Sequence, residues 1–385
     1  MRDVVIVGGG PVGMLLACVL AQRGLDIEVL EQRVEPARLS RAIGIHPPSL
    51  VALGHAGVAD AVLAGAARIR DGEVWSDGSR LGSLTFDRLR TEHRFVASLP
   101  QHVTEELLAA RLHSLAPGAL RRGVRVTSVR DLPDRVVVGV EQGEGAGEID
   151  ARFVLAADGA RSTVRAAAGI PWREYGHPET YLMADFPADA ALESIAVLYF
   201  ERSGVVESLP LPGGQRRWVA LTAGLQTGAS GADLADIIRS RTGVQLPATT
   251  DTPSAFTARQ RLAGRFVSGR TVLVGDAAHE ISPIGGQGMN LGWLDVLELA
   301  PALEQAVRGS VAGATAAADT LAGLRRYDQH RRSKARMAMR QAGFNMAMGR
   351  PIDGVPLRAR NSVVRVLALP PANGVVARAF TMRWL

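Results

Sequence analysis

The sequence predicts an α/β protein with a parallel sheet, an inserted sheet that is mostly antiparallel, and helices at the C-terminal end. Three observations support this prediction. An apolar strand runs into a glycine-rich turn at residues 4–13, a similar strand and turn occur at 271–292, and residues 171–256 are rich in short extended runs. With 385 residues and 47% hydrophobic content, the chain is long enough for two closely joined domains.

The composition argues against nucleic-acid binding and metal chemistry. The 44 Lys and Arg residues and the 38 Asp and Glu residues leave a net charge of +6, which is too small and dispersed to indicate a nucleic-acid partner. The eight histidines show no ligand spacing. The single cysteine, Cys18, excludes an intramolecular disulfide and a cysteine-cluster metal site, so we expect no metal and a cytoplasmic protein.

The segment Val4–Leu20, "VVIVGGGPVGMLLACVL", has the apolar character of a signal peptide or a membrane span. Its central glycines and proline, the lack of a basic leader and the lack of a cleavage site argue against both alternatives. We predict a strand, a turn and a helix here. Because no other apolar run reaches spanning length, we expect no integral membrane segment.

The spacing of the first glycines is typical of a dinucleotide site. In GxGxxG, Gly8 permits the tight turn, Gly10 lets the backbone approach a pyrophosphate, and Gly13 lets the helix pack on the strand. The helix amino terminus offers free N–H groups to the phosphates. A second strand ends at Glu31, whose carboxylate suits a ribose diol and disfavours a 2′-phosphate. The motif predicts a site for the adenosine half of FAD or NAD.

A later cluster, Gly143, Gly145 and Gly147, resembles this pattern only superficially. It lies between the extended runs "RVVVGVE" and "EIDARFVLAAD", and no helix follows it. This arrangement predicts a hairpin loop and not a second dinucleotide domain.

A second motif follows the strand "RFVLAADG". Asp158 and Gly159 end that strand, and Arg161 and Arg165 come at the first turns of the next helix. These residues indicate either a ligand site or a helix cap in which Asp158 or Ser162 accepts backbone N–H groups. The residues alone leave both interpretations open.

The third motif, "GDAAHEISPIGGQGMNLG", begins at the end of the strand "TVLVGD". Asp276 is placed to accept hydrogen bonds from a polyol, Pro283 stiffens the turn, and the following glycines let a flat ring approach the backbone. The helix that begins near Met289 would favour an anionic ring system at its positive end. We expect a structural role for His279 inside this motif.

These three motifs, in this order, resemble the group A flavoprotein monooxygenases, the p-hydroxybenzoate hydroxylase-like aromatic hydroxylases, over nearly the whole chain. The resemblance implies a GR2-type Rossmann-like FAD-binding domain at 1–70, 96–170 and 257–385 and a β-sheet substrate domain at 71–95 and 171–256. Within that sheet, Tyr199, Leu209, Leu211 and Trp218 are candidates for the substrate pocket, with a position in the hydrophobic core as the alternative.

The resemblance also implies the site residues. The expected cofactor contacts are Gly8, Gly10, Pro11, Val12, Gly13, Glu31, Gln32, Arg33, Arg41, Gln101, Asp158, Gly159, Arg161, Gly275, Asp276, Pro283, Gly286, Gln287, Gly288, Met289 and Asn290. Arg41, Pro283 and Gly286 are expected at the reacting end, with a solvated surface arginine as the alternative for Arg41.

The implied activity is the hydroxylation of an aromatic or polycyclic phenolic small molecule by way of a flavin C4a-hydroperoxide, with NADPH or NADH as electron donor and O2 as co-substrate. A flavin-dependent halogenase, an FAD-dependent reductase and a non-catalytic flavin-binding protein are the alternatives. The halogenase is disfavoured because the only lysine, Lys334, lies in the basic segment 325–341.

We interpret the basic segment 325–341 as a solvated helix, with a membrane-surface or nucleic-acid contact as the alternative. Both a monomer and a homodimer are compatible with the sequence.

Overall fold

The first sheet is built around β1 (Arg2–Val7), whose apolar residues are buried from Val4 to Val7. In this computed structural model, which describes the chain except for residues 37–41, 189–191, 193, 313–316 and 384–385, the sheet order is β17-β18-β11-β1-β2-β8. The neighbours of β1 are parallel to it, and strands buried on both faces are typical of parallel sheets. The strand bounds are β2 (Ile27–Glu31), β8 (Leu120–Arg122), β11 (Gly145–Ala156), β17 (Val267–Ser268) and β18 (Thr271–Leu273).

Helix α1 (Pro11–Gln22) follows the first glycine turn, as predicted. Proline is compatible with the first helical turn because its missing N–H would have no partner there. Gly24 has φ +77°, so the chain leaves the helix in a conformation that favours glycine. Residues 13–20 are all buried, and the Cys18 thiol contacts the carbonyl of Leu108, which confirms its packing role.

The later glycine cluster, Gly143, Gly145 and Gly147, lies in a hairpin, as predicted. β10 (Val136–Gln142) pairs antiparallel with β11 and with β9 (Val124–Asp131). Glu141 lies opposite Ala146 next to the turn. The glycines therefore lead into a strand and not into a helix, which confirms the predicted hairpin.

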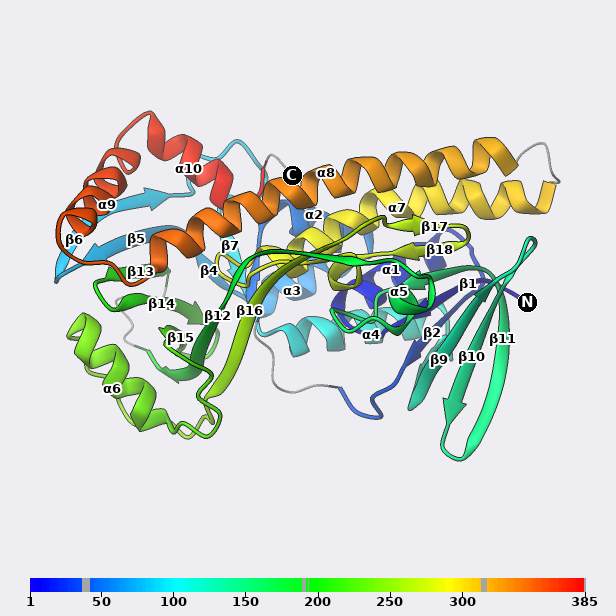
Figure 1. Cartoon of the computed structure of the whole chain (residues 1–385), viewed down its shortest axis with the longest axis horizontal. Coiled ribbons are helices and arrows are strands. Elements are labelled where there is room, and N and C mark those ends of the chain that lie inside the picture. Colours follow the sequence, from blue (N-terminus) through cyan, green and yellow to red (C-terminus); the bar gives the residue numbers. More distant parts are fainter. Residues whose placement is uncertain (37–41, 189–191, 193, 313–316, 384–385) are drawn as a thin grey trace.

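The second sheet is mostly antiparallel and has the order β19-β16-β12-β15-β14-β13-β5-β6. Among the strand pairs of the described residues in this sheet, β13–β5 is the parallel one. Figure 1 shows the long strands β12 and β16 running from this sheet toward the first one. The bounds are β5 (Asp71–Ser76), β6 (Ser79–Thr85), β12 (Trp172–Pro187), β13 (Ile195–Glu201), β14 (Gly204–Leu211), β15 (Gln215–Thr222), β16 (Ser254–Ala263) and β19 (His279–Glu280).

Side chains alternate between the two faces of this sheet. One face includes Met183, Val219 and Phe256, and the other includes Leu182 and Trp218. Helix α6 (Gly231–Thr242) covers the second of these faces through Leu234 and Ile238. Its amino terminus is closed by a capping box between Ser230 and Asp233, and it ends at Gly243, where φ is +75°.

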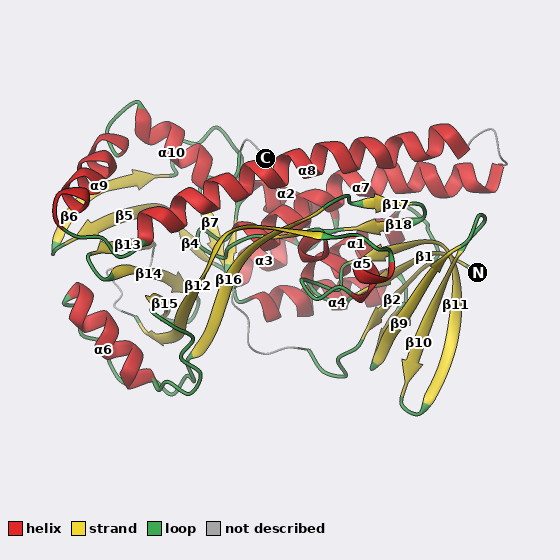
Figure 2. Cartoon of the chain, in the orientation of Figure 1, coloured by secondary structure: helices red, strands yellow, loops and turns green. Residues whose placement is uncertain are grey.

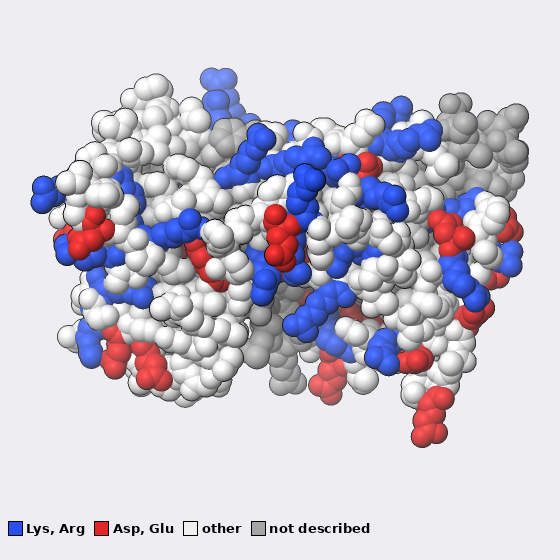
Figure 3. Space-filling view, viewed as in Figure 1, with Lys and Arg blue, Asp and Glu red and all other residues white. Residues whose placement is uncertain are grey.

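The C-terminal part is helical, and Figure 2 shows α7 (Gln287–Ala312) and α8 (Ala317–Gly349) side by side along the molecule. Together with the two sheets, these helices confirm the predicted fold class. Basic side chains are prominent over the region of α8 in Figure 3. The buried face of α8 includes Leu324, Tyr327 and Ala335, so this basic helix is only partly solvated.

Two further helices, α9 (Gly354–Leu367) and α10 (Ala372–Phe380), close the end of the second sheet. In the described part of the chain, no single helix combines the length and apolar character needed to cross a membrane. The α9–α10 pair meets the length and composition requirement together, but its two helices are bent by 94°. The remaining elements are β3 (Gly44–Ile45), α2 (Pro47–His55), α3 (Ala59–Gly65), β4 (Ala67–Ile69), β7 (Val96–Ser98), α4 (Gln101–Leu115), α5 (Thr163–Ala167) and η2 (Gly275–Ala277).

Candidate active site

A cavity of about 1070 Å³ extends from the carboxyl ends of the parallel strands to one face of the second sheet. The predicted site residues that line it are Gly8, Gly10, Pro11, Val12, Glu31, Gln32, Arg33, Gln101, Asp158, Gly159, Arg161, Asp276, Pro283, Gly286, Gly288 and Met289. Gly13, Gly275, Gln287 and Asn290 are not among its lining residues, and Arg41 lies outside the described residues. The three motifs therefore meet around one space although they are far apart in sequence.

The first glycine turn leaves no room for side chains at two of its positions. A Cβ atom at Gly8, where φ is +107°, would overlap the Ala157 carbonyl, and one at Gly13 would overlap the Gly8 carbonyl. Gly10 has no neighbouring atom within 4 Å of the corresponding position. Gly8 and Gly13 thus shape the turn, while Gly10 leaves its backbone open to the cavity.

The Glu31 carboxylate is fixed beside this turn. It accepts the N–H of Gly9 at 2.8 Å and the N–H of Arg33 at 2.9 Å, and the Arg33 guanidinium donates to it at 3.0 Å. Burial would raise the pKa of Glu31, but these hydrogen bonds hold it below its usual value. Glu31 is therefore an ionised acceptor at the end of β2.

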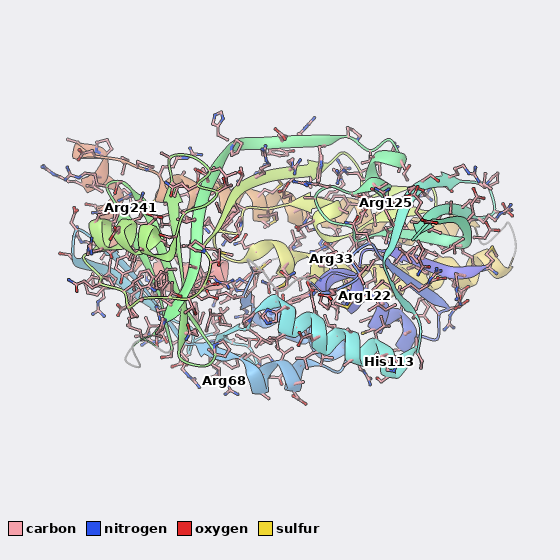
Figure 4. The ribbon with its side chains drawn as sticks, turned by 90° about the horizontal axis from the view of Figure 1, so that it is seen from below. Arg33, Arg68, His113, Arg122, Arg125 and Arg241 are labelled. Atoms are coloured by element: carbon pink, nitrogen blue, oxygen red, sulfur yellow. The ribbon has the colours of Figure 1, made fainter. Side chains whose placement is uncertain are left out.

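Basic side chains surround the same end of the cavity. Arg33 and Arg125 line it, and Figure 4 shows them together with Arg122 from below the molecule. Burial raises the pKa of Glu105, and the positive charges of Arg33 and Arg122 oppose that effect. This charge distribution favours an anionic group at this end of the cavity.

Asp158 caps a helix and also lines the cavity. Its Oδ2 accepts the backbone N–H groups of Thr163 at 2.8 Å and Val164 at 3.2 Å, which caps α5. Its Oδ1 is buried and has no hydrogen-bond partner among the described residues. Arg165 points elsewhere: it donates to the Ala277 carbonyl at 3.1 Å and stacks on Trp172, 3.9 Å from the ring centroid.

The third motif forms a tight turn that His46 and Asn290 brace. Gly285 and Gly286 have φ +87° and +67°, and the N–H of Gly286 donates to the Pro283 carbonyl at 2.8 Å. The Asn290 amide donates to the carbonyls of Gly286 at 2.6 Å and Gly44 at 2.8 Å, and its oxygen accepts the His46 N–H at 2.9 Å. Asn290 thus holds the cavity wall in place from behind.

His46, which the sequence analysis did not single out, lines the cavity next to this turn. Its Nε2 lies 3.1 Å from the Gly285 carbonyl, and its buried Nδ1 has no partner among the described residues. Burial lowers the pKa of His46 to about 4, against the smaller effect of the Gly285 contact. The ring is therefore neutral near pH 7 and donates from Nε2.

A buried ionic network supports the third motif. The Asp295 carboxylate lies 2.6 Å from His279 Nε2 and 2.7 Å from Arg331 Nε, and it accepts the Gly275 N–H at 3.1 Å. Burial would raise the pKa of Asp295, but the charges and hydrogen bonds of His279 and Arg331 lower it. The predicted structural role of His279 is confirmed.

The second sheet contributes an apolar wall with few polar groups. Leu209 lines the cavity, but Tyr199, Leu211 and Trp218 do not, so their assignment to the pocket is wrong and the core alternative applies. Tyr199 and Trp218 stack with centroids 6.0 Å apart on the opposite face, under α6. The cavity face instead presents Glu207, which the sequence analysis missed although it is an acid in the otherwise uncharged strand "GVVESLPL".

The described residues contain no group of three or more His, Cys, Asp or Glu side chains that could hold a metal ion. The polar groups of the cavity are instead those that suit an organic ligand. Open backbone lies at Gly10, a carboxylate at Glu31, and an unpartnered carboxyl oxygen at Asp158.

Comparison with known proteins places these features among flavoproteins. Residues 1–342 match the model of the family described as FAD binding domain. A rifampicin monooxygenase from Streptomyces venezuelae is 34% identical over 321 residues, covering 80% of this chain and 65% of that protein. A 6-methylpretetramide 4-monooxygenase from Streptomyces rimosus is 35% identical over 322 residues, covering 80% of this chain and 56% of that protein. The chain therefore spans less than two thirds of the length of these two relatives.

Among solved structures, a p-nitrophenol 4-monooxygenase from Pseudomonas putida superposes with a TM-score of 0.87. The match covers 99% of this chain and 97% of that one, at 24% sequence identity. This similarity supports the fold.

Proposed function

Because the chain belongs to the FAD binding domain family, the group A flavoprotein hydroxylases, we propose that it is an FAD-dependent monooxygenase that hydroxylates an aromatic or polycyclic phenolic small molecule. The observation that carries the proposal is the continuity of the cavity. It connects the first glycine turn, at Gly10, with the apolar wall at Leu209 by way of the Pro283 turn. A cofactor with an adenosine end and a flat reactive end needs a site of this extent.

The residues present fit FAD. In this proposal the pyrophosphate lies against the open backbone at Gly10, and the Glu31 carboxylate binds the adenosine ribose. The unpartnered Oδ1 of Asp158 and the exposed carboxylate of Asp276 are placed to accept hydrogen bonds from the ligand. Gln101, Arg161 and Arg41 are further proposed contacts.

The reactive end of the cofactor would lie at the third motif. Pro283, Gly286 and Gly288 line the cavity without long side chains, so a flat ring can approach their backbone. Gln287 and Asn290 would then act by holding that backbone in place. We further propose that the second sheet, with residues 71–95 and 171–256, forms a substrate domain on the cavity.

Bound FAD would supply electron transfer from NADPH or NADH to dioxygen. Overall, one oxygen atom enters a C–H bond of the substrate as a hydroxyl group and the other leaves as water, with one hydride from the nicotinamide and one proton from solvent consumed. The protein's part is to orient the substrate and to exclude water. The buried apolar side chains Met183, Val205 and Val219 suit the second task because they line the cavity and pack in one cluster with Ile284.

Labelled dioxygen tests this function. The purified protein should contain FAD, oxidise NADPH or NADH, and transfer one labelled oxygen atom into a polycyclic phenol. A product without label, formed equally well without oxygen, would favour the reductase, and a halide-dependent product would favour the halogenase. A protein that retains FAD but does not oxidise either nicotinamide would instead be a flavin-binding protein.

A further inference from the structure

We propose that Glu207 is the substrate-anchoring residue of this cavity, and that it selects molecules that present a phenolic hydroxyl donor, and carry no carboxylate, at the sheet wall. This inference rests on the proposed function, because it identifies the substrate class of the same site. Its basis is the placement of one carboxyl group in an otherwise apolar part of the wall.

Strand alternation directs Glu207 into the cavity. Val205, Glu207 and Leu209 of β14 all line it, whereas Val206 packs under α6 on the other face. The cross-strand neighbours of Glu207 are Leu198 in β13 and Val219 in β15, and both also line the cavity. The two residues paired directly with Glu207 are thus apolar.

Glu207 has no partner within the described part of the chain. It is 6% exposed, and neither a hydrogen bond nor an ion pair from another described residue reaches its carboxyl group. Burial by itself raises the pKa of Glu207 to about 7. A buried carboxyl without a donor is costly, so it indicates that a ligand supplies the donor.

The charged and titratable groups around Glu207 are engaged elsewhere. Arg217 of β15 donates to Asp185 at 2.7 and 2.8 Å, and the hydroxyl of Tyr181 in β12 donates to Glu179 at 2.7 Å. Glu73 of β5 accepts from Trp75 and Arg80, and Arg259 of β16 is exposed. None of these groups therefore satisfies Glu207.

The wall that carries Glu207 faces the third motif. Ile284 in the glycine turn packs in one cluster with Val205 and Val219, the residues beside Glu207 along the strand and across it. A flat substrate held between this wall and the turn can therefore present a hydroxyl group to Glu207. A substrate carboxylate in the same place would meet a like charge in a buried site, which is unfavourable.

Three matched probes test this selection: 2-naphthol, 2-methoxynaphthalene and 2-naphthoate. Their binding to the FAD-loaded protein is measured by calorimetry at pH 8, so that no oxygenation is needed. We expect the naphthol to bind about ten-fold more tightly than the ether, because only the naphthol donates to the carboxylate, and the naphthoate to bind most weakly. The apolar Glu207→Leu substitution should abolish the preference for naphthol and improve the binding of naphthoate.

The matched control is Glu201→Gln. Glu201 is also a buried glutamate in this sheet, but it accepts the Asp77 N–H at 3.1 Å and does not line the cavity. This variant should keep the naphthol preference. The inference is overturned if the wild-type protein does not prefer naphthol to the ether, or if Glu207→Leu retains that preference.

Thermal unfolding without ligand provides a second readout. The folded-state pKa of Glu207 lies above the unfolded value of about 4.3, so the carboxyl progressively destabilises the fold as pH rises from 5 to 8. Glu207→Leu should therefore gain melting temperature relative to wild type over this range. An equal loss at pH 5 and pH 8 would show a structural partner for Glu207 and contradict the inference, while the labelled-dioxygen result would still stand for the proposed function.

Discussion

The Asp295 carboxylate lies 2.6 Å from His279 Nε2, and both side chains are fully buried behind the third motif. Arg331, which is 1% exposed, contacts the other oxygen of the same carboxylate at 2.7 Å. Helices α7 and α8 are thereby joined to the segment that carries Asp276. This buried network should therefore contribute to the stability of the fold.

Asp295→Ala should lower the free energy of unfolding by about 3–5 kcal/mol, because it leaves the Arg331 charge buried without its main partner. Chemical denaturation followed by circular dichroism measures this change. Asp236→Ala is the control, because Asp236 is 65% exposed in its pair with Arg239 and its loss should cost less than about 1 kcal/mol. Equal effects of the two substitutions would contradict a supporting role for the buried network.

Asp276→Ala should weaken FAD binding by roughly one to two orders of magnitude, because a charge-assisted hydrogen bond is worth about 1.5–3 kcal/mol. Reconstitution of the FAD-free protein, followed by flavin fluorescence, measures the affinity. Asp26→Ala is a suitable control, because Asp26 lies at the start of β2 and pairs with Arg2 outside the cavity. Unchanged affinity in a folded Asp276→Ala variant would leave this carboxylate without a role in binding.

Gly286→Leu should uncouple nicotinamide oxidation from hydroxylation and release peroxide. A Cβ atom at Gly286 would lie 3.6 Å from His46 Nε2 in the cavity wall, so a leucine side chain would crowd the space proposed for the flavin ring. The ratio of peroxide formed to NAD(P)H consumed is the measurement. Gly214→Leu controls for backbone strain, because Gly214 has the same φ of +67° but lies in the exposed turn between β14 and β15. A similar peroxide ratio in both variants would attribute the effect to strain alone.

His46 should make the fold acid-sensitive. Its folded-state pKa of about 4 lies below the usual 6.5, so the unfolded chain binds its proton first and stability falls as pH drops from about 6.5 toward 4. The loss attributable to this residue has an upper bound of about 3 kcal/mol. His46→Gln, which cannot titrate, should show a smaller stability difference between pH 7 and pH 4.5, measured by urea denaturation at each pH. An unchanged difference would mean that His46 does not carry the acid sensitivity.

Local sequence patterns were sufficient for the motifs and for the fold class. The glycines at positions 8, 10 and 13 predict a strand, a turn and a helix because each has a distinct steric reason that involves only near neighbours in the chain and one adjacent strand. The hairpin at Gly143 was equally predictable, since two extended runs flank a short turn. The identity of the family followed from the order of three such motifs.

The faces of the second sheet could not be predicted in the same way. Tyr199 and Trp218 suit a substrate pocket by size and chemistry, but they lie under α6, while Glu207 lies in the cavity. The alternation of side chains along a strand predicts only that residues 206 and 207 point to opposite faces of the sheet. Which face meets the cavity depends on where α6 packs, and that is a long-range contact.

The sequence by itself determined the strand–turn–helix units, the expected cofactor class and the acid at the end of the second strand, Glu31, because these follow from backbone sterics and from the spacing of residues close together in the chain. Tertiary structure alone decided that Asn290 braces the wall between Gly44 and Gly286, and that Glu207 stands without a donor among the described residues. The physical reason is that burial and hydrogen-bond partnership are properties of segments brought together from distant parts of the chain. A single strand shows the type and spacing of its side chains, but what covers each of its faces is settled only when the sheets and helices pack.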